Sequence, residues 1–301
     1  MTSPDGPDGP ENRVDDATAV FGHHRALLVG AAYRLLGSHS DAQDVVQEVW
    51  IRWHAVDHTT VDEPRAYLLT ITSRLALNRL RQLRQQRESY VGPWLPEPVS
   101  SDPRDDGAAA AELADDVSMA MLIVLESLSP LERAAFVLAD VFGMPSAEVG
   151  ETLGRSPAAV RQLVHRARSH VEARQPRAVV DESRHREVTE RFLAAATNGD
   201  LAGLVAVLSP DVTLVTDGGG IRRAALRPIH TADKVIRWLF GVMGRRDAEP
   251  VTARLQVVNG ETAVVLDTPD GVDSVWFVTV EDDRVSEVHA IRNPDKLGAV
   301  H

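Results

Sequence analysis

The stretch Leu128–Val171, LSPLERAAFVLADVFGMPSAEVGETLGRSPAAVRQLVHRARSHV, decides the fold of the middle of the chain. Ser129 precedes one helical pattern, and a short second helix ends in a turn at Gly154. A last helix then starts with Ser156 as N-cap and Pro157 at its first position, where both residue types are preferred. Helices joined by a short turn that contains glycine predict a helix-turn-helix, whose second helix suits the major groove of DNA.

The last helix of this stretch has two distinct faces. Its apolar stripe comprises Val160, Leu163, Val164, Ala167 and Val171. Its outward positions hold Arg161, Gln162, His165, Arg166 and Ser169. Arginine can bind guanine through two atoms and glutamine can bind adenine, so this face can read base edges. Arg155 and Arg168 are better suited to phosphates, which position a protein on DNA without reading its sequence.

The chain before this stretch reads as three further helices between Phe21 and Tyr90. Ser40 is expected to cap a helix that starts at Asp41 and runs through DAQDVVQEVWIRWHAV. One face of that helix is apolar, and the other carries Asp41, Asp44, Gln47 and Glu48. The third helix follows Pro64 and runs into a series of arginines. Residues 1–18 are rich in Pro, Gly and Asp, which predicts a disordered tail.

The net charge of -12 averages over separate basic and acidic blocks of the sequence. Every charged residue from Arg65 to Arg87 is an arginine, and only Glu172 interrupts a second arginine set from Arg155 to Arg177. Acidic residues gather in the N-terminal tail and in a connector that holds Asp102, Asp105, Asp106, Glu112, Asp115 and Asp116. Two basic stripes on one chain favour two nucleic-acid contacts, although charge alone fits two solvated helix faces equally well.

The composition excludes several classes of protein. A chain of 301 residues is long enough for two or three domains, and it contains no cysteine. Disulfides, thiolate metal sites and a cysteine nucleophile are therefore excluded, and we expect no metal and no cofactor. The N-terminus lacks the pattern of a signal peptide, and no apolar run approaches the ~20 residues of a membrane helix. We expect a cytoplasmic protein without a membrane partner.

A linker rich in proline and glycine separates the two helical parts. It spans residues 91–117 and contains most of the motif YVGPWLPEP, which starts one residue earlier, at Tyr90. Tyr90 and Trp94 place two aromatic rings in a segment that should otherwise be polar. Such rings are expected to be buried against another part of the protein.

The C-terminal part predicts an α+β domain. Helical patterns over residues 185–208 precede a strand that ends at Gly218-Gly219-Gly220, a further helix, and four alternating runs with an Asn259-Gly260 turn. We expect a half-open cone of antiparallel sheet, with Trp238, Phe240, Trp276 and Phe277 in its core. Asp217, Asp267 and His289 are candidates for proton transfer in such a cone, but the sequence does not show them converging, and an enzyme is not the favoured interpretation.

Both helical parts carry the motifs of a known family. SDAQDVVQEVWIRW with PRAYLLTITSRLALNRLRQLRQQR resembles region 2 of bacterial extracytoplasmic-function sigma factors, and the helix-turn-helix resembles their region 4. The C-terminal part looks like a SnoaL-like domain of the NTF2 superfamily, which the sigma-J-like sub-group carries fused. This resemblance divides the chain into region 2 (19–90), the linker (91–117), region 4 (118–178) and the SnoaL-like domain (183–301).

The resemblance implies a role for each predicted face. The acidic face of Asp41, Asp44, Gln47 and Glu48 would bind core RNA polymerase through charge complementarity. The minus-ten promoter element would be bound by Arg74, Asn78, Arg79, Arg81 and Arg84. Asn78 departs from the family, which more often has Asp there. The minus-thirty-five element would be bound by Arg155, Ser156, Arg161, Gln162, His165, Arg166 and Arg168.

The fused domain is expected to regulate the other two. Three motifs point to an intramolecular contact, and they comprise Trp94, Leu95, Pro96, Glu97 and Pro98; Asp217, Gly218, Gly219 and Gly220; and Asn293, Pro294, Asp295, Lys296 and Leu297. We expect the linker motif to dock on one of the other two. A ligand-sensing regulator whose cone binds a small molecule, a stand-alone helix-turn-helix regulator and a separate anti-sigma partner stay open at this stage.

Overall fold

The computed structural model describes residues 10–101, 117–174, 181–243 and 251–301. It divides into two compact units, Met1–Leu83 with Leu128–His170, and Arg84–Ser127 with Val171–His301. The predicted acidic connector lies outside the described residues. The helix-turn-helix shares a unit with the first helices. The segment between these two parts belongs with the C-terminal domain instead.

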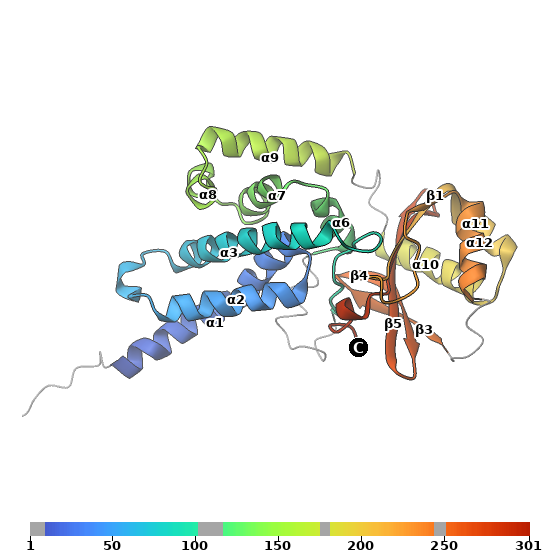
Figure 1. Ribbon diagram of the computed structural model, residues 1–301, viewed down its shortest axis with the longest axis horizontal. Coiled ribbons are helices and arrows are strands. Elements are labelled where there is room, and N and C mark those ends of the chain that lie inside the picture. Colours follow the sequence, from blue (N-terminus) through green and yellow to red (C-terminus); the bar gives the residue numbers. More distant parts are fainter. Residues whose placement is uncertain (1–9, 102–116, 175–180, 244–250) are drawn as a thin grey trace, which may run out of the picture. The chain divides into compact units, whose positions relative to one another are not determined.

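The first unit begins with three α-helices (Figure 1). They are α1 (Pro10–Leu36), α2 (His39–His54) and α3 (Pro64–Arg87), with a short 3₁₀ turn, η1 (His58–Thr60), before α3. The last turn of α3 lies in the second unit. The prediction of a disordered tail through residue 18 is wrong from Pro10 onward, because α1 already begins there.

Tertiary contacts explain why α1 extends into the expected tail. Ala17 is buried, and its carbonyl accepts a hydrogen bond of 3.0 Å from the indole Nε1 of Trp53. Phe21, one turn later, is also buried and packs against Trp50. The polar composition of the tail concealed the apolar residues that hold α1 against α2.

The start of α2 differs by two residues from the prediction. Ser38, not Ser40, is the N-cap, and its hydroxyl accepts a 3.2 Å hydrogen bond from the amide of Asp41. A capping hydroxyl reaches the amide three residues ahead, and Asp41 stands at that distance from Ser38. Ser40 lies within the first turn, with its hydroxyl 3.1 Å from that of Ser38.

The predicted helix-turn-helix is present. It contains α7 (Pro130–Phe136), a π-helical turn η2 (Val137–Val141), α8 (Ser146–Leu153) and α9 (Pro157–Glu172). Ser129 caps α7 and forms a capping box with Glu132. Proline and serine thus set the starts of these helices as the sequence indicated, whereas the π-turn gave no recognisable signal.

Two glycines make the tight turn between α8 and α9 possible. A Cβ atom on Gly150 would lie 2.6 Å from the carbonyl oxygen of Arg155, closer than packed atoms come. Gly154 ends α8 in the left-handed conformation, with φ of 63°. The two positions together fix the angle at which α9 leaves α8.

Buried arginines connect α1 to the helix-turn-helix within the first unit. The guanidinium Nε of Arg133 donates a 2.8 Å hydrogen bond to the carbonyl of Arg34, and only 2% of Arg133 is exposed. The guanidinium of Arg34 lies 5.6 Å from the centre of the Phe142 ring. Neither buried arginine was predicted, because an arginine in a charged stretch of sequence is normally expected at the surface.

The second unit contains a six-stranded sheet. Its strand order is β2-β1-β6-β5-β4-β3. The strands are β1 (Leu208–Asp217), β2 (Ile229–His230), β3 (Thr252–Val258), β4 (Glu261–Thr268), β5 (Gly271–Glu281) and β6 (Arg284–Ile291). The prediction of a wholly antiparallel sheet is wrong at one pair, because β1 and β6 run parallel. Hairpin signals reveal only strands adjacent in sequence, and β1 and β6 are its first and last long strands.

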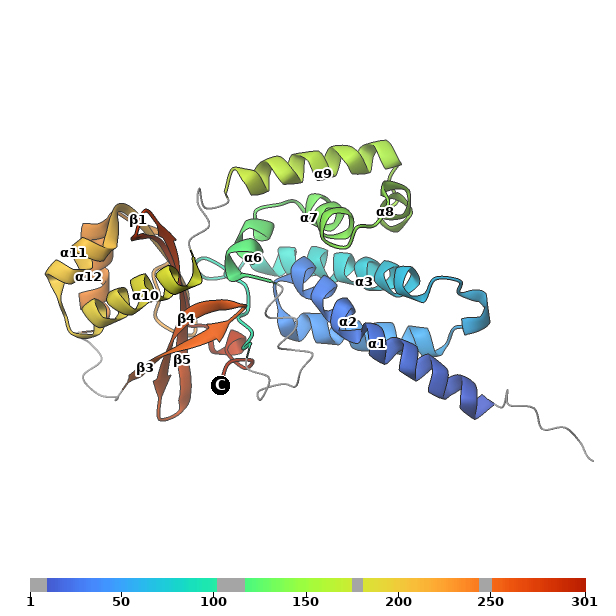
Figure 2. The ribbon, with the colours of Figure 1, turned by 180° about the vertical axis from the view of Figure 1, so that it is seen from behind.

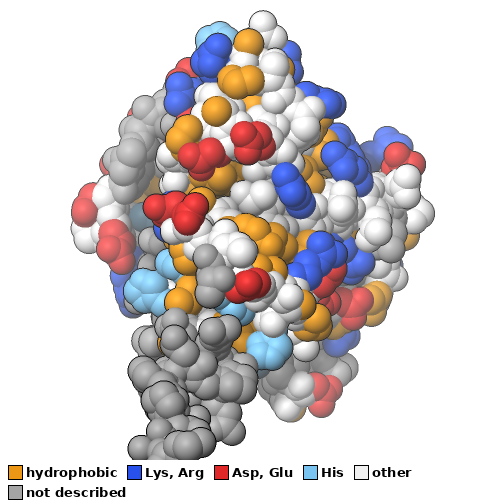
Figure 3. Space-filling view, turned by 90° about the vertical axis from the view of Figure 1, so that its left-hand side faces the viewer, with side chains coloured by type: hydrophobic (Ala, Val, Ile, Leu, Met, Phe, Trp, Pro, Cys, Tyr) orange, Lys and Arg blue, Asp and Glu red, His pale blue; other side chains and the backbone are white. Residues whose placement is uncertain are grey.

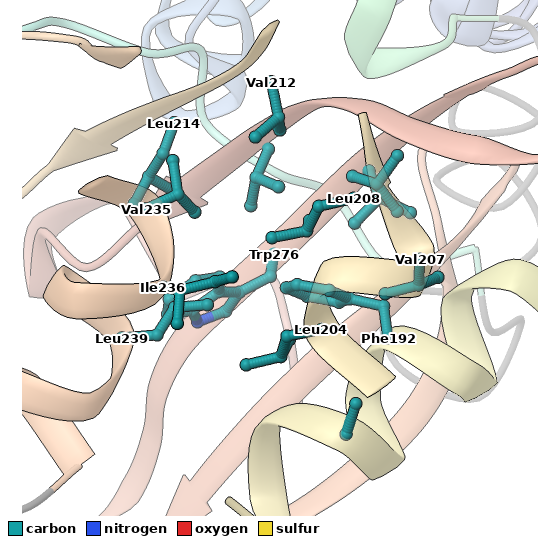
Figure 4. Packing of buried hydrophobic residues seen from close by; sticks show 14 of the residues in the cluster. Phe192, Leu204, Val207, Leu208, Val212, Leu214, Val235, Ile236, Leu239 and Trp276 are labelled. Carbon is teal, nitrogen blue, oxygen red and sulfur yellow. The ribbon is translucent and has the colours of Figure 1, made fainter. Parts of the chain in front are cut away.

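Three helices cover one side of this sheet. Figures 1 and 2 show α10 (Glu182–Thr197), α11 (Leu201–Val207) and α12 (Ala232–Met243) together on that side. Phe192 from α10, Leu239 from α12 and Trp276 from β5 point toward one another between helices and sheet (Figure 4). Trp238 and Phe240 pack partly buried against this core.

The described part of the linker and the end of the chain lie on the other side of the sheet. Figures 1 and 2 show α6 (Met119–Glu126) and the 3₁₀ turn η3 (Pro294–Lys296) there. The backbone amide of Ser101 donates to the carbonyl of Val257, so the linker also pairs with edge strand β3. Phe277 is buried, although it alternates with Trp276 and therefore points to this second side.

Candidate functional site

The exposed face of α3 carries the residues predicted to bind the minus-ten element. Arg74, Asn78 and Arg81 recur at helical spacing and are exposed, and Arg84 is exposed at the next turn. Arg81 donates a 3.1 Å hydrogen bond to the side-chain oxygen of Asn78. Arg74 donates to the carbonyl of Glu151 at 3.2 Å. The exposed part of this face is therefore basic and already partly ordered by hydrogen bonds within the first unit.

Arg79 stands apart from this exposed face. Its guanidinium forms an ion pair of 2.6 Å with Asp41 at the start of α2. Only 14% of the Asp41 side chain is exposed. The structure thus joins a residue assigned to DNA with a residue assigned to polymerase, which gives both a structural role between α2 and α3.

The remaining acidic face of α2 is exposed. Asp44, Gln47 and Glu48 all lie at the surface, and Glu48 forms an ion pair with Arg52 one turn later. Ile51 on the same face is 63% exposed, and the sequence analysis missed it. Its helical position relative to Gln47 was the available signal. An exposed apolar residue among acidic ones is typical of a protein contact.

The recognition helix α9 presents a polar face to solvent. Arg161, Gln162 and His165 are exposed, and within the part of the chain that the structure describes their side chains form no hydrogen bond or ion pair. Ser156 caps the helix by accepting from the amide of Ala159 at 3.2 Å. These three side chains are consequently available to a DNA groove.

Arg166 and Arg168 contact their own helix-turn-helix instead. Arg168 forms a bidentate pair with Asp140, with N–O distances of 2.6 and 2.7 Å. Arg166 pairs with Glu132 at 2.9 Å. The Ser129 hydroxyl, together with Arg166, holds the pKa of Glu132 below its ordinary value. Figure 3 likewise shows basic and acidic side chains interspersed on one face of the molecule.

The three motifs assigned to an interdomain contact meet around Asp217. This carboxylate is fully buried and accepts from the Tyr90 hydroxyl at 2.5 Å and from the Leu95 amide at 2.8 Å. The ammonium of Lys296 donates to the same carboxylate at 2.6 Å and to the carbonyl of Leu95 at 2.5 Å. Asn293 also donates to the Tyr90 hydroxyl, at 3.0 Å.

Trp94 lies between two cations. The guanidinium carbon of Arg87 lies 3.4 Å from the centre of its ring, and the ammonium of Lys296 lies 3.9 Å from it. Burial lowers the pKa of Lys296 to about 8, although Asp217 acts in the opposite direction. Cations over an indole ring are stabilised by its negative face, and more strongly where water is excluded.

Other residues of these motifs are buried or allow the segments to pack closely. Leu95, Pro96, Glu97 and Pro98 are all buried. A Cβ atom on Gly219 would lie 2.5 Å from the side-chain nitrogen of Asn293. Glycine at this position therefore allows β1 and the C-terminal motif to approach closely enough to share Tyr90.

Within the described residues, no hydrogen bond or ion pair joins the three candidates for proton transfer to one another. Asp217 is bound by Lys296, and Asp267 pairs with Arg254 at 2.7 Å. Burial lowers the pKa of His289 to about 4, so this imidazole is neutral at pH 7. They lie on β1, β4 and β6, at positions alternating with the residues that face the core under the helices.

The described residues contain no cluster of His, Cys, Asp and Glu that could hold a metal ion. A search of the same residues for a helix both long and apolar enough to cross a membrane finds none.

Family models match both helical parts of the chain. Sigma-70 region 2 matches residues 20–86, and Sigma-70 region 4 matches residues 118–171. The crystal structure of the Mycobacterium tuberculosis extracytoplasmic function sigma factor SigJ superposes with a TM-score of 0.76 and 39% identity. It covers 94% of this chain and 99% of that one. Its match extends over the helical parts and the α+β domain together.

Curated relatives agree with this match. The ECF RNA polymerase sigma factor SigJ of Mycobacterium tuberculosis is 42% identical over 284 residues, which covers 91% of this chain and 90% of SigJ. The probable ECF RNA polymerase sigma factor SigI of the same species is 32% identical over 286 residues, which covers 94% of this chain and 95% of SigI. The chain therefore belongs to the extracytoplasmic-function RNA polymerase sigma factors, which direct promoter-specific initiation of transcription.

Proposed function

We propose that three surfaces of this sigma factor each bind a different partner during transcription initiation. The exposed face of α2, with Asp44, Gln47, Glu48 and Ile51, binds core RNA polymerase. The exposed face of α3 binds the minus-ten element. Arg161, Gln162 and His165 of α9 read the minus-thirty-five element, while Arg166 and Arg168 stiffen the helix-turn-helix. The exposure of α9 side chains with no partner among the described residues carries this assignment.

The assignment of α9 is tested by DNA binding of the assembled holoenzyme. Replacing Arg161 by Ala should weaken binding to the cognate minus-thirty-five sequence about 5- to 150-fold, as expected for the loss of one bidentate base contact. Replacing Arg168 by Ala should leave sequence discrimination unchanged, since Asp140 already holds that guanidinium. Equal losses of discrimination in the two variants would contradict the assignment.

We further propose that the C-terminal domain is a built-in regulator and performs no catalysis. Its support is the buried site around Asp217, which ties the linker between the two DNA-binding regions to the domain. The family's SnoaL-like resemblance leaves a ligand-sensing alternative. The residues between the helices and the sheet pack as a hydrophobic core, however, and offer no observation in its favour.

Trp94 provides the test of regulation. Replacing it by Ala should remove the ring between Arg87 and Lys296 and change the transcript yield in vitro with core polymerase. The conservative Trp94→Phe variant keeps an aromatic face for both cations and should behave like the wild type. If both variants transcribe like the wild type while the linker of Trp94→Ala loses protection from hydrogen exchange, the docked linker does not regulate.

A further inference from the structure

The first helix of region 4 behaves as a part of the C-terminal domain. The region 4 model starts at residue 118 and so includes α6. The structure nevertheless places α6 in the unit of the C-terminal domain, while α7, α8 and nearly all of α9 belong to the other unit. Since α6 is separated from the rest of region 4, specific contacts must hold it in the unit of the C-terminal domain.

Glu261, the first residue of β4, binds the N-terminus of α6. Its carboxylate accepts a 2.7 Å hydrogen bond from the amide of Met119, and the amide of Ala120 donates to it as well. The Ser118 hydroxyl accepts from Met121, the third amide of the helix. The first amides of a helix have no partner within it, so an acceptor from another segment satisfies them.

Asn259 holds the chain just before α6. It lies in the turn between β3 and β4, is fully buried and has a φ of 52°. Its side-chain nitrogen donates to the carbonyl of Val117 at 3.2 Å, and its side-chain oxygen accepts from the amide of Val99 at 3.0 Å. One amide group therefore binds both arms of the linker.

The other end of α6 is held by an ion pair. Glu126 accepts from Arg87 at 2.5 Å, and both side chains are more than four-fifths buried. Arg87 is the last residue of α3 and stacks on Trp94. Between the two ends, Met119, Leu122 and Leu125 are buried. The polar contacts at both ends thus fix α6 within this unit.

Docking of α6 limits the freedom of the helix-turn-helix that follows it. Only Ser127, Leu128 and Ser129 connect α6 to α7. Three residues reach about 10 Å when fully extended, so α7 cannot move far from a docked α6. Undocking would add the eight residues of α6 to that connection.

We propose that the turn between β3 and β4 is a docking surface for the first helix of region 4, with Glu261 and Asn259 as positioning residues. Through it the C-terminal domain sets how far the recognition helix can reach from region 2. This inference deepens the proposed regulatory function and rests on it. It assigns the control to α6, whereas the linker motif around Trp94 secures the segment before it.

Hydrogen exchange in the full chain tests the docking. Glu261→Ala removes the acceptor of two helix amides, and exchange of residues 119–126 should rise at least about fivefold, since two hydrogen bonds of ordinary strength contribute that factor or more. Glu261→Gln keeps one acceptor and should show a smaller rise. Asp270→Ala removes an exposed carboxylate from the next hairpin and is the matched control. The measurements are made at pH 6, because burial raises the pKa of Glu261 to about 7 and its docked carboxyl then keeps its proton.

Transcription with core polymerase tests the control. Promoters whose two elements are separated by spacers one base pair shorter or longer should be used more readily by Glu261→Ala than by the wild type. A merely structural role would lower yield on all spacers equally and would overturn the proposal. Unchanged exchange of α6 in Glu261→Ala would overturn it too, and Asn259→Gly, which keeps the turn but removes the bridging amide, provides a second variant if the first does not fold.

The outcomes separate this inference from the regulatory function beneath it. If Trp94→Ala alters transcription and Glu261→Ala releases α6 without altering spacer use, the domain regulates by another route and the inference is wrong. If neither variant alters transcription although both release their segments, the regulatory function itself is wrong.

Discussion

Replacing Asp217 by Asn should release the linker from the C-terminal domain. The carboxylate accepts from Tyr90, Leu95, Gly219 and Lys296, and it is fully buried. An asparagine presents an NH₂ group to some of these donors and leaves Lys296 without its counter-charge. Removing one partner of a buried ion pair costs about 3–5 kcal/mol.

The upper end of this range follows from the titration of Lys296. An unpaired buried ammonium can lose its proton, and neutralising an amine with an ordinary pKa of 10.5 at pH 7 costs about 5 kcal/mol. Loss of the proton thus limits the penalty. A cost of about 3–5 kcal/mol corresponds to a rise of roughly a hundredfold or more in the opening of the docked segment.

Hydrogen exchange of residues 90–101 measures this opening directly. Asp270→Asn removes the same charge from an exposed turn and should leave the exchange unchanged. The double variant Asp217→Asn with Lys296→Met should recover part of the protection, because it no longer buries an unpaired charge. Exchange within threefold of the wild type in Asp217→Asn would refute the reasoning, and so would a double variant that exchanges faster than the single one.

Three further predictions follow from the same structure. Burial raises the pKa of Glu261 to about 7 from an ordinary 4.5, so Glu261 holds its proton more tightly when α6 is docked than when α6 is free. Docking should therefore be strongest below about pH 4.5 and weaken by about 3 kcal/mol as pH rises from about 4.5 to 7, as hydrogen exchange of residues 119–126 corrected for intrinsic rates would show. A Glu261→Gln variant with the same pH response would count against this. Gly150→Ala should destabilise the first unit by more than about 1 kcal/mol in urea unfolding, because its Cβ would meet the Arg155 carbonyl. Gly22→Ala, in open space within α1, should instead stabilise it by up to about 1 kcal/mol, and equal effects would argue against a tight turn. Arg133→Met should destabilise the first unit by about 1–3 kcal/mol because it removes the buried 2.8 Å hydrogen bond to the Arg34 carbonyl, and an unchanged urea midpoint would show that this contact is dispensable.

Local signals in the sequence located most of the secondary structure. Serine and proline at helix starts gave α7 and α9, and the Asn259-Gly260 turn gave the β3–β4 hairpin. The two-residue strand β2 and the parallel pairing of β1 with β6 were missed, because neither leaves a pattern along the chain. The Ser38 cap was displaced to Ser40, since two serines in adjacent turns offer the same signal.

The site residues, like the secondary structure, were predicted only in part. Motifs predicted that Trp94, Asp217 and Lys296 belong to one contact, and in the structure Lys296 donates a hydrogen bond to Asp217 and lies over the ring of Trp94. The roles of Arg87 and Glu261 were invisible, because a charged residue in sequence gives no sign that a distant segment will bury it. Asp41 and Arg79 show the converse. Both were predicted on exposed binding faces, yet they form an ion pair with each other between α2 and α3.

The two-armed hydrogen bonding of Asn259 has a consequence for how the linker tolerates change. Val99 and Val117 are bound to the same side chain, so two positions 18 residues apart in the sequence lie at one point of the C-terminal domain. The entropy of closing a chain between two fixed anchors grows by only about 0.6 kcal/mol per doubling of its length. Changes in the length of sequence between Val99 and Val117 should therefore cost little stability as long as Asn259 holds both anchors.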